Sequence, residues 1–204
     1  TVTTPFYHNL KQRGVGKICL IPNGADTTIF YPRDRQETRM KLGLSQESFL
    51  VLYSAGLHVA TYYNLEVVIH AFESFVIENE IGKAALLLLG AGLEEHNFFP
   101  KNSHVNITNL GRQRSLKEMA EIIACCDVAV IPFGDNLLHK NVYPARLFEY
   151  GACGVPIIAM AHEESILAGL IKKHKLGLVV PPMKARELAD AMNKMYLNTY
   201  LRTT

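Results

Sequence analysis

Short apolar runs alternate along this chain with longer stretches in which apolar residues recur at helical spacing. The short runs are rich in aliphatic residues and are closed by turn residues such as Pro22, Asn23 and Gly24, which is typical of buried strands. The strands predicted in this way cover residues 17–21, 49–54, 84–89, 105–110, 128–131, 155–159 and 178–180. Because strands that alternate with helices form parallel sheets, we expect a parallel arrangement.

Apolar residues three and four positions apart predict the amphipathic helices between these strands. The stretch that starts with Leu65, Val68 and Ile69 is the clearest example, and Gly43 is placed to end the helix before it. The predicted helices cover residues 35–42, 65–76, 116–123, a part of 141–156, 165–174 and 188–200. We therefore predict an α/β fold, a Rossmann-like, doubly wound parallel sheet of about six strands with helices on both faces.

Composition narrows the class of protein only a little. The 204 residues are 49% hydrophobic and 20% charged with a net charge of +2, so no basic surface for nucleic acid is indicated. The longest apolar run, residues 84–89, is too short to cross a bilayer. The four cysteines, at 19, 125, 126 and 153, lack the spacing of a metal site and suit buried thiols in a reducing cytoplasm.

The most informative segment is residues 141–156, NVYPARLFEYGACGVP, which carries a helix between two predicted strands. Arg146 and Glu149 fall near the start of this helix, and Gly154 ends it. A helix start above the carboxyl edge of the sheet attracts phosphate, and a carboxylate there can bind a ribose diol. The residues alone leave open that Glu149 is a solvated carboxylate favoured by the helix dipole and that Arg146 is an exposed surface cation.

Several short motifs, in their order along the chain, resemble those of one enzyme family. They are IPNGAD at 21–26 with Phe30 and Pro32, GAG at 90–92, LG at 110–111, PARLFEY at 144–150, GVP at 154–156 and GLVVPP at 177–182. Together they resemble the retaining GT-B glycosyltransferases of group 1 (family 4). Residues 144–150 are similar to the branch with the motif Pro-x-Lys/Arg-x-x-Glu-Tyr, and Asn141 stands where many members have a first Glu.

The resemblance implies a set of residues around a nucleotide-sugar donor. Asn141 and Arg146 would be catalytic, and Arg146 would contact the diphosphate because Leu57 and Tyr63 stand where many members have Arg and Lys. The donor-binding residues implied are Gly56, His58, Arg112, Tyr143, Ala145, Arg146, Leu147 and Glu149. Alternatives without a binding role stay open. Asn141 could instead be the N-cap of the next helix, and the side chains of His58 and Arg112 could simply be solvated.

The order of the motifs also predicts the domain organisation. In the family, the element similar to residues 21–26 follows a complete N-terminal domain that binds the acceptor. We therefore expect residues 1–16 to be the tail of that domain and 17–204 to be the C-terminal, donor-binding domain.

The resulting hypothesis is a glycosyltransferase that transfers a sugar from a nucleotide-diphosphate sugar to a polysaccharide or lipid-linked acceptor in cell-surface glycan synthesis. We expect no metal or other cofactor, no nucleic acid partner and a cytoplasmic location, with peripheral contact to the inner face of the cell membrane allowed. Two alternatives remain: a nucleotide-sugar 2-epimerase of the same fold, and a degenerate donor domain that acts as a binding or scaffold partner. Asn141 and the missing Arg/Lys pair favour the latter.

Overall fold

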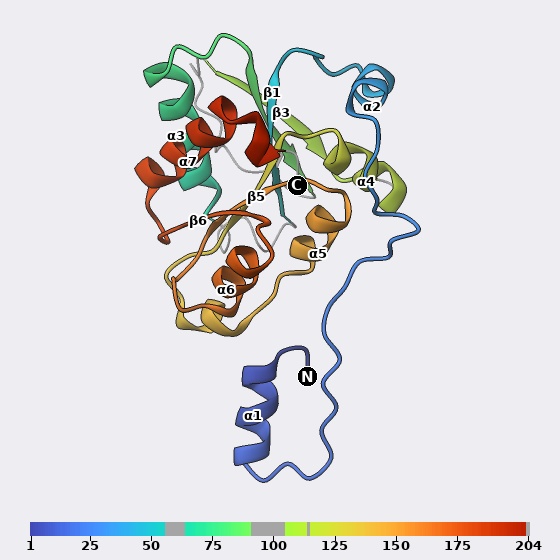
Figure 1. Ribbon diagram of the computed structural model, residues 1–204, viewed down its shortest axis with the longest axis vertical. Coiled ribbons are helices and arrows are strands. Elements are labelled where there is room, and N and C mark those ends of the chain that lie inside the picture. The colour runs from blue at the N-terminus through green and yellow to red at the C-terminus, as the bar shows by residue number, and fades with distance from the viewer. Residues whose placement is uncertain (56–63, 91–104, 114, 203–204) are drawn as a thin grey trace.

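Six parallel strands form one sheet in the order β3-β2-β1-β4-β5-β6 (Figure 1). The protein is represented by a computed structural model that describes residues 1–55, 64–90, 105–113 and 115–202. The strands are β1 (Phe49–Ser54), β2 (Ala84–Leu89), β3 (Asn106–Gly111), β4 (Val128–Pro132), β5 (Ile157–Met160) and β6 (Gly177–Val180). The strand order reverses between β1 and β4, and ligands of doubly wound folds bind at the carboxyl ends of the strands at such a point.

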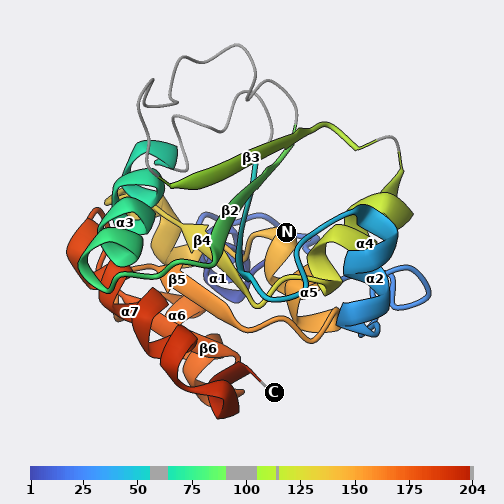
Figure 2. The same cartoon turned by 90° about the horizontal axis from the view of Figure 1, so that it is seen from above.

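Helices cover both faces of the sheet, as Figure 2 shows from above. The elements outside the sheet are α1 (Thr4–Gln12), α2 (Arg35–Leu42), α3 (Leu65–Glu78), α4 (Leu116–Ala124), η2 (Leu137–Asn141), α5 (Ala145–Ala152), α6 (Ile166–Lys173), α7 (Ala185–Leu197) and η3 (Thr199–Arg202). The predicted fold class, a doubly wound parallel sheet with helices on both faces, is confirmed.

The core consists of two apolar layers because successive side chains of a strand point to opposite faces. From β1, Val51 and Tyr53 pack with α3 and α7 on one face. Leu50 and Leu52 pack with α4, α5 and α6 on the other. Ser54, the last residue of β1, therefore follows Leu50 and Leu52 toward the face that carries α5.

Helix boundaries follow the capping residues in the sequence. Asp34 accepts a hydrogen bond from the Glu37 N–H at the start of α2 (2.8 Å), and Gly43 ends that helix at a φ of 68°. Ser115 and Glu118 form a reciprocal capping box at the start of α4. This box fixes the first turn of α4 beside the cavity described below.

The strand predicted at residues 17–21 is wrong. These residues are extended but join no strand of the sheet, and Ile21 is 70% exposed. Their backbone bonds run to the start of the chain instead, with the Ile21 N–H donating to the Thr1 carbonyl at 2.9 Å. An apolar run becomes a strand only where a neighbouring strand completes its hydrogen bonds, and here α1 and this segment lie apart from the sheet (Figure 1).

Candidate functional site

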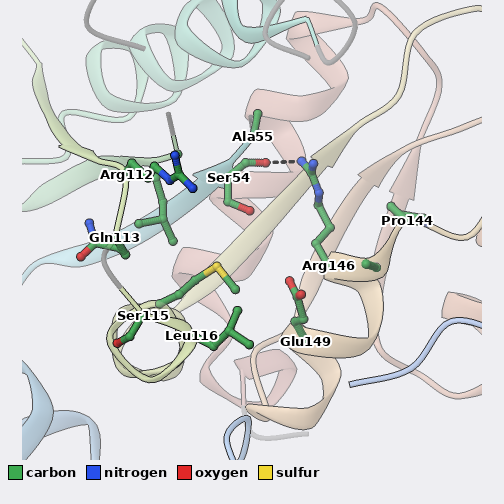
Figure 3. A pocket seen from close by; sticks show the side chains of 13 residues that line it. Ser54, Ala55, Arg112, Gln113, Ser115, Leu116, Pro144, Arg146 and Glu149 are labelled. Carbon is green, nitrogen blue, oxygen red and sulfur yellow. Dashed lines mark hydrogen bonds between the residues drawn. The ribbon is translucent and has the colours of Figure 1, made fainter. Parts of the chain in front are cut away.

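A cavity of about 660 Å³ lies at the carboxyl ends of β1 and β2, between the starts of α4 and α5 (Figure 3). Its position is the point at which the strand order reverses. Its volume falls within the range of about 300–1,000 Å³ that small-molecule sites occupy. The reversal of strand order and the position of the cavity therefore indicate the same candidate site.

The floor of the cavity depends on Gly90, which follows β2. A Cβ atom at this position would lie 1.6 Å from the carbonyl oxygen of Ala55, and the φ of Gly90 is 140°. Only glycine accepts both this backbone conformation and this close approach. Gly90, the first residue of the predicted GAG motif, therefore allows the ends of β1 and β2 to meet beneath the cavity.

Helix α5 contributes the charged groups on one side. Arg146 extends toward the end of β1 and donates to the carbonyl oxygen of Ser54, and Glu149 lies one turn further along the helix (Figure 3). Pro144 caps the start of α5, and both Pro144 and Ala145 line the cavity. The first turn of a helix offers N–H groups that lack intrahelical partners, so this wall suits an anion.

Burial raises the pKa of Glu149 above its usual range, although the positive charge of Arg146 acts in the opposite direction. The carboxylate is thus partly removed from water next to a fixed cation. A carboxylate placed in this way accepts hydrogen bonds from a neutral polyol more strongly than a solvated one, because water competes less.

The opposite wall comes from the end of β3 and the start of α4. Arg112 lies across the cavity from Arg146 (Figure 3). The Gln113 side chain donates to the Leu110 carbonyl at 2.8 Å, which holds this turn in place. Leu116 and Met119 of α4 add an apolar surface beside it. This combination of a polar turn and an apolar surface suits a flat, partly apolar group.

The structure brings four of the predicted site residues together. Arg112, Ala145, Arg146 and Glu149 all line the cavity. Gly56 and His58 lie outside the described residues.

The other three predicted residues lie elsewhere. Leu147 is 1% exposed and packs in the core, so its side chain is a poor candidate for ligand contact. Asn141 ends η2, and the residue that caps α5 is Pro144, so the alternative interpretation of Asn141 as that cap is wrong. Tyr143 packs edge-on against Phe148, with ring centroids 6.1 Å apart, and its carbonyl accepts from the Asn23 side chain at 3.1 Å.

Sequence reasoning missed Ser54 and Ser115, together with the apolar residues Leu116 and Met119. Ser54 ends an apolar strand, and a polar residue directly after a buried strand is a usable signal for this edge of a sheet. Leu116 and Met119 gave no such signal, because apolar residues at helical spacing indicate a core face.

Among the described residues, no group of three or more His, Cys, Asp and Glu side chains is arranged to hold a metal ion. In the same part of the chain, no helix has both the length and the apolar character needed to cross a membrane.

Comparison with known proteins defines the class of the chain. Residues 48–198 match the model of the family described as glycosyl transferases group 1. The match covers most of the sequence, so the chain belongs to the glycosyl transferases group 1 family.

Individual relatives are distant. The chain is 24% identical over 189 residues to a D-inositol 3-phosphate glycosyltransferase of Stackebrandtia nassauensis, with 88% of this chain and 41% of that protein covered. The chain thus spans less than half the length of this curated relative.

Solved structures share the fold. The C-terminal domain of the glycosyl transferase group 1 family protein LpcC from Francisella tularensis superposes with a TM-score of 0.69 at 17% identity, over 88% of this chain and 91% of that one. Anabaena Alr3699/HepE, in complex with UDP and glucose, gives a TM-score of 0.73 at 17% identity, over 100% of this chain and 55% of that one. At these identities the likeness concerns the fold alone.

Proposed function

We propose that this chain is the donor-binding domain of a glycosyltransferase that uses a nucleotide-diphosphate sugar. The observation that carries the proposal is the pair Arg146 and Glu149 on α5, at the cavity above the reversal of strand order. Membership in the glycosyl transferases group 1 family supports it, as does the fold shared with a protein solved in complex with UDP and glucose.

The residues divide naturally among the parts of such a donor. Glu149 would accept hydrogen bonds from the ribose hydroxyls, and the start of α5 with Arg146 would face the diphosphate. The base would lie between the turn at Arg112 and the apolar surface of Leu116 and Met119. During transfer, the acceptor hydroxyl oxygen would bond to the anomeric carbon as the bond from that carbon to the leaving phosphate oxygen breaks, and the hydroxyl proton would pass to the departing diphosphate. Arg146 would stabilise the negative charge that develops on the leaving oxygen.

The finer features of the reaction are proposed from the motif resemblance. The acceptor would be a polysaccharide or a lipid-linked sugar, and the sugar would retain its anomeric configuration. Residues 17–204 would form the C-terminal, donor-binding domain, with residues 1–16 as the tail of a preceding one. The likeness to the C-terminal domain of LpcC supports this division. We propose that the donor site works without a metal ion.

Calorimetric titration with UDP and with GDP tests the proposal. We expect one of the two nucleotides to bind and the substitutions Glu149→Ala and Arg146→Ala each to weaken it at least about 10-fold, as expected for lost hydrogen bonds to charged groups. Glu187→Ala and Arg186→Ala are matched controls, because these residues lie on α7, on the other face of the sheet. If neither nucleotide binds to a folded chain, the donor site is absent and a non-catalytic, scaffold role is favoured.

A further inference from the structure

Ser54 is held by α5 through two separate hydrogen bonds. Its carbonyl oxygen accepts from Arg146, and its hydroxyl oxygen lies 2.7 Å from the hydroxyl oxygen of Tyr150. Arg146 and Tyr150 are four residues apart, so both project from one side of the helix. Ser54 is partly exposed and lines the cavity, whereas Tyr150 is 0% exposed and lies behind it in the core.

The surroundings decide which of the two hydroxyl groups donates. Among the described residues, Ser54 is the hydrogen-bond partner found for the Tyr150 hydroxyl. If Ser54 donated, the phenolic proton would be buried without an acceptor, which is unfavourable. Burial also raises the pKa of Tyr150 to about 12, so the phenol keeps its proton at any working pH. Tyr150 is therefore the donor and the Ser54 oxygen the acceptor.

This assignment leaves the proton of Ser54 available on the cavity side. No other acceptor for it is found in the described part of the chain, and Figure 3 shows the Ser54 side chain next to Arg146, with Glu149 further along α5. A hydroxyl that already accepts a hydrogen bond is a stronger donor, because the two bonds polarise each other. The cavity thus contains a neutral O–H donor, the Ser54 hydroxyl, next to the guanidinium of Arg146. The hydrogen bond from Tyr150 orients this hydroxyl.

We propose that Ser54 is a further ligand-binding residue whose hydroxyl donates to a phosphate oxygen of the bound nucleoside diphosphate, and that Tyr150 is its positioning residue. The inference rests on the proposed function and extends it to a residue outside the motifs. A phosphate oxygen fits better than a ribose hydroxyl, because it can only accept and because Arg146 next to Ser54 attracts an anion. Glu149, which can only accept when ionised, remains the partner for the ribose.

The test compares a nucleoside diphosphate with its nucleoside. We would titrate UDP, GDP, uridine and guanosine into the wild-type chain and into Ser54→Ala, Ser54→Thr, Tyr150→Phe and the double variant Ser54→Ala/Tyr150→Phe. Ser54→Ala should weaken the diphosphate about 10-fold and leave the nucleoside within about twofold, because only the bond to the charged oxygen is lost. Ser54→Thr keeps the hydroxyl and should retain most of the affinity.

Tyr150→Phe separates positioning from direct contact. It should weaken the diphosphate about 3-fold, less than Ser54→Ala does, because the serine hydroxyl remains but loses its orientation. The double variant should bind no more weakly than Ser54→Ala, since two residues that act through one bond are not additive. The double variant also leaves no unpaired phenol, so it keeps the test valid if Ser54→Ala unfolds. Ser74→Ala on α3 is the matched control.

Wild-type affinity in Ser54→Ala, or equal losses for the nucleoside and the diphosphate, would overturn the inference. If Glu149→Ala and Arg146→Ala abolish binding while the Ser54 variants do not change it, this inference alone fails. If the folded wild-type chain binds no nucleotide at all, the proposed function fails and this inference with it.

Discussion

Glu149 shows at the scale of one residue how binding can oppose stability. Its carboxylate is useful to a polyol ligand because it is partly shielded from water, and that shielding penalises the charged form in the free protein. Arg146 offsets part of this penalty. Strained or destabilised groups of this kind are expected at sites that bind ligands and rare elsewhere.

The raised pKa of Glu149 predicts how stability depends on pH. A carboxyl group whose pKa is higher in the folded than in the unfolded state stabilises the fold below its unfolded pKa, and this contribution is lost as pH rises through the folded pKa. Glu149→Gln has no such titration. We therefore expect the variant to be more stable than the wild type at pH 8 and to lose this advantage toward pH 4. Urea unfolding at a series of pH values measures the difference.

The matched control for this experiment is Glu187→Gln, an exposed acid at the start of α7. Its stability difference from the wild type should not change in the direction predicted for Glu149→Gln. A Glu149→Gln variant that is less stable than the wild type at pH 8 would show that Glu149 forms a stabilising contact in the free protein, and the trade-off would not exist.

At the scale of elements, Asp127 links several helices and strands at the amino-terminal ends of β1 and β4, whereas the cavity lies at the carboxyl ends of the strands. Its carboxylate accepts from the Leu50 N–H at 2.8 Å and from Arg39 of α2 at 2.7 Å. Arg35 and Arg202 lie 3.3 and 3.4 Å from the same carboxylate. Both Asp127 and Arg39 are almost fully buried, and Arg39 also donates to the Cys125 carbonyl at 2.9 Å. One carboxylate thus joins α2, β1, the start of β4 and η3.

We expect Asp127→Asn to destabilise the protein by about 3–5 kcal/mol, because removing one member of a buried ion pair leaves the other charge uncompensated. The nucleotide affinity of the folded fraction should not change, since these strand ends are remote from the cavity. The midpoint and slope of urea unfolding measure the loss. Asp190→Asn is the control, because Asp190 forms an exposed pair with Arg186 that is worth only a few tenths of a kcal/mol. A loss no larger than that of the control would contradict the prediction.

Elements also show what the sequence allows one to predict. The six sheet strands and the α-helices from residue 35 onward follow from local apolar patterns and caps, because each of them packs on the core through the apolar face that its own sequence predicts. The short helix η2 was not predicted. Residues 17–21 carry a strand-like pattern but have no neighbouring strand, and no local signal reveals that. The bond between Ser54 and Tyr150 joins residues 96 positions apart, so only the fold brings it into view. Arg146 and Glu149 were predictable because one helix turn fixes their relation.

At the scale of the whole molecule, the chain matches 41% of the length of its curated relative. The candidate cavity is bordered by α4 on one side and α5 on the other, and in the proposed function the groups described around it bind the donor. Transfer needs an acceptor hydroxyl held close to the anomeric carbon of that donor, and such positioning supplies a large part of catalysis. Among the described residues we find no second set of polar groups facing this cavity that would hold an acceptor.

We therefore predict that the 204-residue chain binds its nucleotide but transfers no sugar, because under the proposed function its described residues position the donor alone. The measurement is incubation with UDP- and GDP-linked sugars and a panel of glycan and lipid-linked acceptors, followed by mass spectrometry of the products. A longer protein that includes an acceptor-binding half should form a glycoside at a rate that Arg146→Ala lowers at least about 100-fold, as for the loss of a group that stabilises the departing charge. Glycoside formed by the 204-residue chain itself would refute the division of labour proposed here. An epimerised nucleotide sugar in place of a glycoside would identify the epimerase alternative, because the donor would then have reacted without an acceptor.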